Sequence, residues 1–182
     1  MEGNKKKEKL KNGIIQVYTG NGKGKTTAAF GLALRAAGRG FKVKIFQFLK
    51  KGGFGSGENK VLSKIENVSV DVFDQPSPVF DRRVTMQSLG KRIKEDFEKA
   101  AEIIGSGRYD VVMLDEFTHV AGVIGIKKIL NALKNRPEGV EIIITGRNAP
   151  AALRKEAALV TEMKEIKHPY KKGLRARKGV EY

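Results

Sequence analysis

Short apolar runs of β-type residues alternate along the chain with longer segments whose apolar residues recur every three or four positions. The short runs predict strands at residues 13–19, 41–48, 68–73, 109–116, 140–145 and 159–166. The longer segments predict helices at residues 26–39, 84–104 and 124–134, with a short helix from about Pro150. Because strands and helices alternate, we expect an α/β fold: a mostly parallel sheet of about six strands with helices on both faces.

Two stretches rich in glycine or proline are predicted to be loops. Residues 52–57 read Gly-Gly-Phe-Gly-Ser-Gly, and residues 74–81 contain Pro76 and Pro78. The chain has 182 residues and shows no internal repeat, which suits one domain with a substantial core. We therefore expect a single domain at residues 13–182 after a basic N-terminal arm at residues 1–12. The pattern does not determine the order of the strands.

The turn after the first strand carries the strongest chemical signal. Residues 18–31 read Tyr-Thr-Gly-Asn-Gly-Lys-Gly-Lys-Thr-Thr-Ala-Ala-Phe-Gly and open an Ala-rich helical segment. A strand, a glycine-rich turn, Gly-Lys-Thr and a helix form the arrangement of a triphosphate-binding P-loop. Its backbone N–H groups and the helix N-terminus attract phosphate, Lys25 adds a positive charge, and the Thr26 hydroxyl can bind Mg²⁺. The candidate nucleotide-binding residues are Gly20, Asn21, Gly22, Lys23, Gly24, Lys25, Thr26 and Thr27.

One position departs from the usual P-loop spacing, in which a glycine precedes Gly-Lys-Ser/Thr by four intervening residues. Thr19 stands where that glycine is expected, and Gly20 follows one place later. A glycine-rich turn that binds nothing is the alternative interpretation. The preceding strand, the following helix and Lys-Thr-Thr at their junction favour the P-loop.

Charged residues also follow later strands of the predicted sheet. The fourth strand ends in Asp115-Glu116, and Thr145-Gly146-Arg147 follows the fifth strand. In wound α/β sheets ligands bind at the carboxyl ends of the strands, so these residues are expected beside the P-loop. An acid in this position of a P-loop protein reaches Mg²⁺ directly or through water, and the pattern leaves open whether Asp115 or Glu116 does so. Arg147 is a candidate phosphate contact, whereas His119, a histidine on a loop, is more typical of a surface or packing residue than of a catalyst.

Composition narrows the function classes. Cysteine is absent, which excludes disulfides, thiolate metal sites and a cysteine nucleophile. No apolar run is long enough for a membrane span or a signal peptide, so we expect a cytoplasmic protein. The net charge of +16 suits a polyanionic partner or a well-solvated surface. Tryptophan is absent and aromatic residues make up 7% of the chain, which disfavours a nucleic-acid stacking platform.

With these motifs in view, the chain resembles the P-loop type of ATP:corrinoid adenosyltransferase, also called cob(I)alamin adenosyltransferase. The resemblance extends from about residue 13 to residue 182, and the offset P-loop is the form found in that family. The matching motifs are residues 19–31, Gln47-Phe48 with Gly57-Glu58, residues 112–116, residues 144–147, Lys167-His168, Gly173, Ala176, Gly179 and Glu181-Tyr182.

The resemblance implies a RecA-like, P-loop NTPase-like domain that transfers the 5′-deoxyadenosyl group of MgATP to the Co(I) of a reduced corrinoid and releases triphosphate. It implies Lys25, Thr26 and Glu116 as catalytic residues, and Mg²⁺ held by Thr26 with Asp115 or Glu116. Co(I) is a strong nucleophile and needs no general base. The implied partners are ATP, the reduced corrinoid, a second copy in a homodimer and a reductase such as a flavoprotein.

One region departs from the family. Well-known members carry a Phe and a Trp in the loop after the third strand, where they press on the corrin. Here that loop is residues 74–81, and only Phe80 or the preceding Phe73 offers a partial substitute. The N-terminal arm, which helps to cover the active site across the dimer in the family, is also short.

Three other functions remain open on the sequence. A RecA-like ATPase acting on nucleic acid is the main alternative, because the P-loop, Asp115-Glu116 and the net charge of +16 also suit it. A small-molecule kinase would need an Arg-rich lid segment, which the sequence does not show. A nucleotide-gated binding module would need no chemistry. The reaction products separate these functions: triphosphate, phosphate, a phosphorylated acceptor, or none.

Overall fold

The fold is a single parallel sheet enclosed by helices. The structure, a computed structural model, describes residues 10–50, 57–75, 81 and 83–180. Its strands are β1 (Ile15–Thr19), β2 (Val43–Lys50), β3 (Val68–Asp74), β4 (Val111–Asp115), β5 (Glu141–Thr145) and β6 (Leu159–Glu162). They lie in the order β3-β2-β4-β5-β1-β6, and each neighbouring pair is parallel. The α/β fold with a six-stranded sheet, predicted from the sequence, is confirmed.

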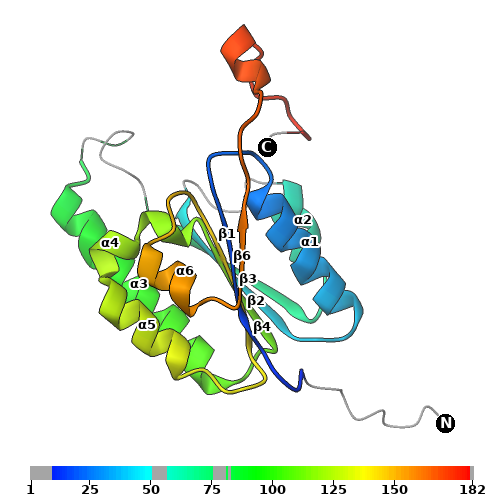
Figure 1. The fold of residues 1–182 in the computed structure, drawn as a ribbon, viewed down its shortest axis with the longest axis vertical. Helices are drawn as coiled ribbons and strands as arrows, with labels where there is room; N and C mark the ends of the chain where they lie inside the picture. Colours follow the sequence, from blue (N-terminus) through cyan, green and yellow to red (C-terminus); the bar gives the residue numbers. More distant parts are fainter. Residues whose placement is uncertain (1–9, 51–56, 76–80, 82, 181–182) are drawn as a thin grey trace.

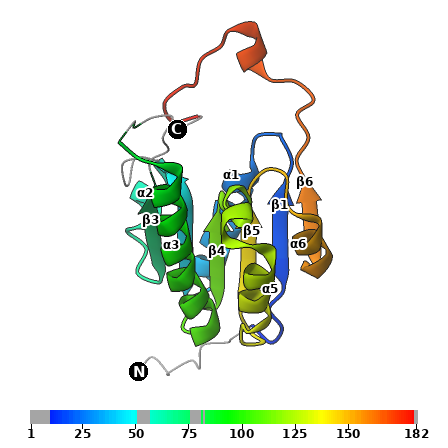
Figure 2. The same cartoon turned by 90° about the vertical axis from the view of Figure 1, so that its left-hand side faces the viewer.

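Helices cover both faces of this sheet (Figures 1 and 2). They are α1 (Lys25–Gly38), α2 (Gly57–Leu62), α3 (Met86–Ser106), α4 (Ala121–Ile124), α5 (Ile126–Lys134) and α6 (Ala151–Glu156), with 3₁₀ turns η1 (Phe117–His119) and η2 (Pro169–Lys172). Apolar residues of α1 and α2 pack against one face. Those of α3 to α6 pack against the other. Two hydrophobic clusters therefore flank the sheet.

Strand β4 shows how the sequence pattern produces this layering. All five of its residues are buried, as its continuous apolar run predicts. Because side chains alternate along a strand, Val111 and Met113 join the cluster under α1, whereas Val112 and Leu114 join the cluster under α3 to α6. The strand lies between β2 and β5, so Asp115 at its end is held in the middle of the carboxyl edge.

Several elements differ from the expectation. The predicted helix at 124–134 is interrupted at Gly125, whose φ of 95° ends α4 and begins α5. Strand β6 ends at Glu162 rather than at residue 166, because its last pair is with Thr19, where β1 gives way to the P-loop. The short elements α2, η1 and η2 were not predicted, since none has enough turns to show a helical period.

Some sequence predictions fall outside the described residues. These are most of the N-terminal arm, the loop at 52–56 and the loop residues 76–80, which include Phe80. Gly57, predicted as the end of the glycine-rich loop, begins α2. Among the described residues, no helix has the length and apolar character needed to cross a bilayer.

Candidate active site

Loops from β1, β2, β4 and β5 meet at the carboxyl edge of the sheet, as expected for the ligand site of a parallel α/β sheet. They line one cavity of about 480 Å³ at the start of α1. The sequence-predicted residues in its wall are Asn21, Gly22, Lys23, Gly24, Lys25, Thr26, Thr27, Glu116 and Arg147. A larger cavity, of about 710 Å³, is lined by Lys42, Asn67 and Tyr109 and contains none of the predicted site residues.

Lys25 lies at the centre of the cationic part of this cavity. It is the first residue of α1, and its Nζ donates a hydrogen bond to the Gly22 carbonyl oxygen at 2.7 Å. Burial lowers the pKa of Lys25, and repulsion from Arg147 lowers it further, while Glu116 opposes the shift. Two cations, one at the start of α1 and one after β5, therefore line the same cavity, and an anion bound between them would relieve their repulsion.

The P-loop glycines have a role that the sequence did not reveal. The N–H of Gly22 donates to the Met163 carbonyl oxygen at 2.7 Å, so it is engaged by the chain that follows β6. A Cβ at Gly22 would lie 2.8 Å from that oxygen and 2.9 Å from the Lys164 carbonyl carbon. Gly20 meets the same backbone. At Gly20 and Gly22 the close approach is to the C-terminal segment, whereas the P-loop motif predicted an approach to phosphate.

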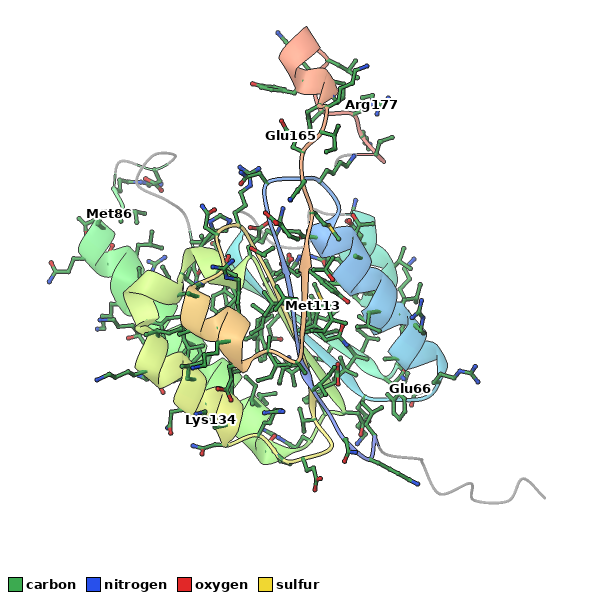
Figure 3. The ribbon with its side chains drawn as sticks, viewed as in Figure 1. Glu66, Met86, Met113, Lys134, Glu165 and Arg177 are labelled. Carbon is green, nitrogen blue, oxygen red and sulfur yellow. The ribbon has the colours of Figure 1, made fainter. Side chains whose placement is uncertain are left out.

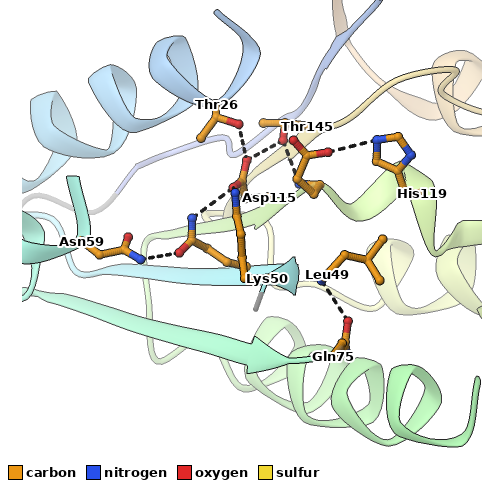
Figure 4. A network of polar contacts seen from close by, with 10 residues as sticks. Thr26, Leu49, Lys50, Asn59, Gln75, Asp115, His119 and Thr145 are labelled. Carbon is orange, nitrogen blue, oxygen red and sulfur yellow. Dashed lines mark hydrogen bonds and ion pairs between the residues drawn. The ribbon is translucent and has the colours of Figure 1, made fainter. Parts of the chain in front are cut away.

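Asp115 is the hub of a buried network below the cavity (Figure 4). It is 0% exposed, and its Oδ1 accepts hydrogen bonds from Thr26 Oγ1 at 2.8 Å and from Thr145 Oγ1 at 2.7 Å. Its Oδ2 accepts from Gln47 Nε2 at 3.1 Å and lies 3.7 Å from Lys50 Nζ. A buried carboxylate with this many donors is held in one fixed orientation.

Glu116 is directed differently from its neighbour. Its backbone adopts a left-handed conformation with φ of 57°, which is uncommon outside glycine, and its N–H donates to Thr145 Oγ1 at 3.0 Å. The turn brings the Glu116 side chain to the cavity wall, where Oε2 lies 3.0 Å from His119 Nε2. His119 itself does not line the cavity. The two adjacent acids thus occupy different places: Asp115 beneath the P-loop and Glu116 facing the cavity.

The arrangement fits a Mg²⁺ ion bound together with phosphate. The Thr26 hydroxyl gives its only hydrogen to Asp115, so its oxygen lone pairs remain for a ligand in the cavity that Thr26 lines. Glu116 supplies a carboxylate in the same wall. Within the described parts of the chain, no group of three or more His, Asp or Glu residues is arranged so that it could hold a metal ion. Few protein ligands suffice for Mg²⁺, which keeps several waters and takes substrate phosphates as ligands.

Several residues that the structure brings to the site carried no assignment from the sequence. Gln47 and Lys50 come from β2, Thr145 ends β5, and Asn59 of α2 donates to Gln47 Oε1 at 2.5 Å. Gln47 was noted only as part of the family resemblance, and Thr145 only as part of the rim. A strand-end position was the available signal for Lys50.

The C-terminal segment also reaches the cavity. After β6 the chain rises from the sheet, carries η2 and returns toward the P-loop; Figure 3 shows Glu165 and Arg177 on this segment. Glu165, His168 and Val180 line the cavity, and Lys23 Nζ donates to the Val180 carbonyl oxygen at 3.2 Å. The basic C-terminal segment therefore helps to enclose the site.

Phe73 is not available as a corrin contact. It is 7% exposed and belongs to the hydrophobic cluster under α3. Its ring stacks on Phe46 at 5.5 Å and meets the edge of Phe48 at 4.9 Å. The suggestion that Phe73 replaces the family's aromatic contacts is therefore wrong, because its burial stabilises the core.

Comparisons with known proteins agree with this geometry. Residues 11–182 match the sequence model of the family "ATP:corrinoid adenosyltransferase BtuR/CobO/CobP". The corrinoid adenosyltransferase of Escherichia coli K12 is 36% identical over 172 residues, covering 93% of this chain and 86% of that protein. That of Pseudomonas aeruginosa is 32% identical over 173 residues, covering 93% and 84%. The structure of the flagellar accessory protein FlaH from Methanocaldococcus jannaschii has a TM-score of 0.59 at 14% identity, covering 84% of this chain and 72% of that one, and so shows similarity of fold alone.

Proposed function

The chain belongs to the ATP:corrinoid adenosyltransferase family, and from this premise we propose that its P-loop cavity is where ATP and a reduced corrinoid react. The enzyme transfers the 5′-deoxyadenosyl group of ATP to the corrinoid. One observation carries the assignment to this cavity: Lys25, Arg147 and the Thr26–Asp115 pair, from three different strand ends, converge on it. This is the equipment needed to hold a triphosphate, and the cavity is the place where a bond to the triphosphate would break.

The chemistry makes limited demands on the protein. The Co(I) of the corrinoid substrate gives an electron pair to the ribose 5′ carbon, the C5′–O bond breaks, and its electron pair leaves with the triphosphate. No proton needs to move, so the site requires orientation and charge stabilisation instead of a general base. Lys25 and Arg147 supply positive charge, and the P-loop N–H groups of residues 23–27 supply donors for the triphosphate.

We assign Mg²⁺ to the Thr26 hydroxyl, with Asp115 orienting that hydroxyl from beneath and Glu116 facing the ion from the wall. When bound, the ion neutralises part of the triphosphate charge. Neutralisation matters here because Glu58, Glu116 and Glu165 also line the cavity and would repel an uncomplexed triphosphate.

We further propose that the enzyme is a cytoplasmic homodimer. A reductase such as a flavoprotein would supply the electrons that reduce its corrinoid substrate to Co(I). The apolar residues exposed on the C-terminal segment support the dimer: Ile166 is 92% exposed and Tyr170 is 71% exposed. A second copy covering this segment would also enclose the cavity that Glu165 and His168 line. The molar mass in solution tests the dimer, because Ile166→Asp should shift the mass toward one chain.

The reaction products test the catalytic assignment. Anaerobic incubation with MgATP and chemically reduced cob(I)alamin should release inorganic triphosphate, visible by ³¹P NMR, in equal amount to the alkylated corrinoid. The RecA-like ATPase alternative predicts ADP and phosphate, increased by DNA or RNA. Formation of ADP and phosphate without corrinoid product would contradict the proposal.

A further inference from the structure

Strand β2 ends irregularly beside the cavity. Its pairing with β3 shifts register between Gln47 and Lys50, which is the mark of a β-bulge. Between them Leu49 adopts a left-handed conformation, with φ of 53°, and its side chain is 38% exposed. A branched aliphatic residue rarely adopts this conformation without support from its surroundings.

That support comes from Gln75, which follows β3. Gln75 is 2% exposed, and its Oε1 accepts the Leu49 N–H at 3.0 Å while its own N–H donates to the Lys50 carbonyl oxygen at 3.2 Å. Its Nε2 donates to Asp96 Oδ2 of α3 at 2.8 Å. The buried Gln75 therefore holds Leu49 through its side-chain amide (Figure 4) and Lys50 through its backbone N–H, and the same side chain is anchored to α3.

The bulge decides where Lys50 points. In a regular strand, side chains two residues apart share a face, so Lys50 would follow Phe48 into the aromatic cluster under α3. Phe48 is indeed buried there, at 0% exposure. Lys50 instead shares the side of Gln47, since both approach Asp115 Oδ2. The register shift thus directs the Lys50 ammonium toward the cavity, whereas a regular strand would place it on the opposite face of the sheet.

We propose that Lys50 contacts the triphosphate and stabilises the charge that develops on it as the C5′–O bond breaks. The inference rests on the proposed function of the same cavity. Lys50 lines that cavity with Lys25 and Arg147, and its side chain is 36% exposed, so it has room to move. Its Nζ lies 3.7 Å from Asp115 Oδ2, beyond hydrogen-bond distance, and Gln47 already donates to that oxygen.

The electron balance of this step is simple. The C5′–O electron pair passes to the triphosphate oxygen, and the Lys50 ammonium keeps its proton and donates a hydrogen bond to the more negative phosphate. Lys50 comes from β2, on the side of β4 away from β1 and β5, which carry Lys25 and Arg147. The leaving group would therefore be held by cations on opposite sides of Asp115.

A purely structural role is the competing explanation, in which Lys50 only neutralises the buried Asp115. The two roles differ in what they predict for ligands. A structural cation changes the stability of the protein, whereas a triphosphate contact changes product binding and kcat. Inorganic triphosphate (tripolyphosphate) with Mg²⁺ is the direct probe, because its binding requires neither corrinoid nor turnover.

The test compares Lys50→Met and Lys50→Arg with Lys60→Met, which removes the same charge from an exposed position of α2 outside the cavity wall. By calorimetry, Lys50→Met should weaken tripolyphosphate binding about tenfold. Its kcat should fall about 100-fold, with KM for ATP changed less than fivefold. Lys50→Arg should recover most of both losses, and Lys60→Met should match wild type. Unchanged tripolyphosphate binding and kcat in Lys50→Met would overturn the inference.

A second variant keeps the test decisive if Lys50→Met does not fold. Gln75→Leu removes the two side-chain hydrogen bonds that hold the bulge and leaves the Lys50 side chain in place. It should lower kcat at least tenfold, and an unchanged kcat in Gln75→Leu would overturn the inference. Where Lys50→Met folds, the double variant should be no slower than Lys50→Met alone, since both act through the same ammonium. Fully additive losses would contradict the coupling. If wild-type protein binds no tripolyphosphate, the proposed function and this inference both fail. If wild type binds it and Lys50→Met binds it equally well, with unchanged kcat, only this inference fails.

Discussion

Replacing Thr145 with valine should destabilise the protein by several kcal/mol without changing the shape of the side chain. Thr145 is fully buried at the end of β5, where its hydroxyl donates to Asp115 Oδ1 at 2.7 Å and accepts the Glu116 N–H at 3.0 Å. Loss of a hydrogen bond to a charged acceptor costs about 1.5–3 kcal/mol, and an unpaired buried N–H costs about 1–3 kcal/mol more. We expect a loss of about 3–5 kcal/mol in the free energy of unfolding.

The matched control is Thr145→Ser, which keeps the hydroxyl and removes one buried methyl group. This change should cost only about 1 kcal/mol. For a chain of this size each kcal/mol corresponds to about 2–4 °C in Tm. Chemical unfolding followed by circular dichroism measures both variants. If valine and serine destabilise the protein equally, the hydroxyl does not organise Asp115 and Glu116 as described.

Three further predictions concern the P-loop. Gly22→Ala should weaken ATP binding at least tenfold, because its Cβ would lie 2.8 Å from the Met163 carbonyl oxygen. The control Gly31→Ala in α1 meets no atom within 4 Å and should stabilise the protein by about 0.5–1 kcal/mol. Equal ATP affinities of the two variants would contradict the clash at Gly22. The lowered pKa of Lys25 means that, between that pKa and 10.5, the unfolded chain binds more protons than the folded one, so the stability of the ligand-free protein should rise with pH. Bound triphosphate should favour the protonated form of Lys25, so ATP affinity should fall as pH rises through this range. Calorimetry in buffers of different ionisation enthalpy should detect uptake of a proton on binding. Binding without proton uptake would exclude Lys25 as the titrating contact. Chelation of Mg²⁺ with EDTA should weaken ATP binding more in wild type than in Thr26→Val, and an equal effect would remove Thr26 as a ligand.

Much of the fold and part of the site follow from local features of the sequence. Periods of two and of three to four residues located the six strands and the longer helices, because each buries an apolar face. The rule that ligands lie at the carboxyl ends of parallel strands brought Glu116 and Arg147 to the P-loop. These inferences need only the residue types and their positions along the chain.

Features that depend on contacts between distant segments were not predictable. The direction of Lys50 depends on Gln75, which lies 25 residues further along and after another strand. The Gly22 N–H bonds to the Met163 carbonyl oxygen, and no local sequence pattern predicts this hydrogen bond. Phe73 looked available for a substrate because it ends a strand beside the predicted loop, but the rings of Phe46 and Phe48 pack against it within the hydrophobic cluster under α3.

The central claim is that the P-loop cavity carries out adenosyl transfer to Co(I). The most direct measurement is the visible spectrum of reduced cob(I)alamin during anaerobic incubation with MgATP and either wild-type protein or Lys25→Ala. Wild-type protein should convert the spectrum to that of adenosylcobalamin, and Lys25→Ala should slow the conversion at least 100-fold while remaining folded. Conversion at the same rate by Lys25→Ala would place the chemistry elsewhere in the molecule and contradict the account.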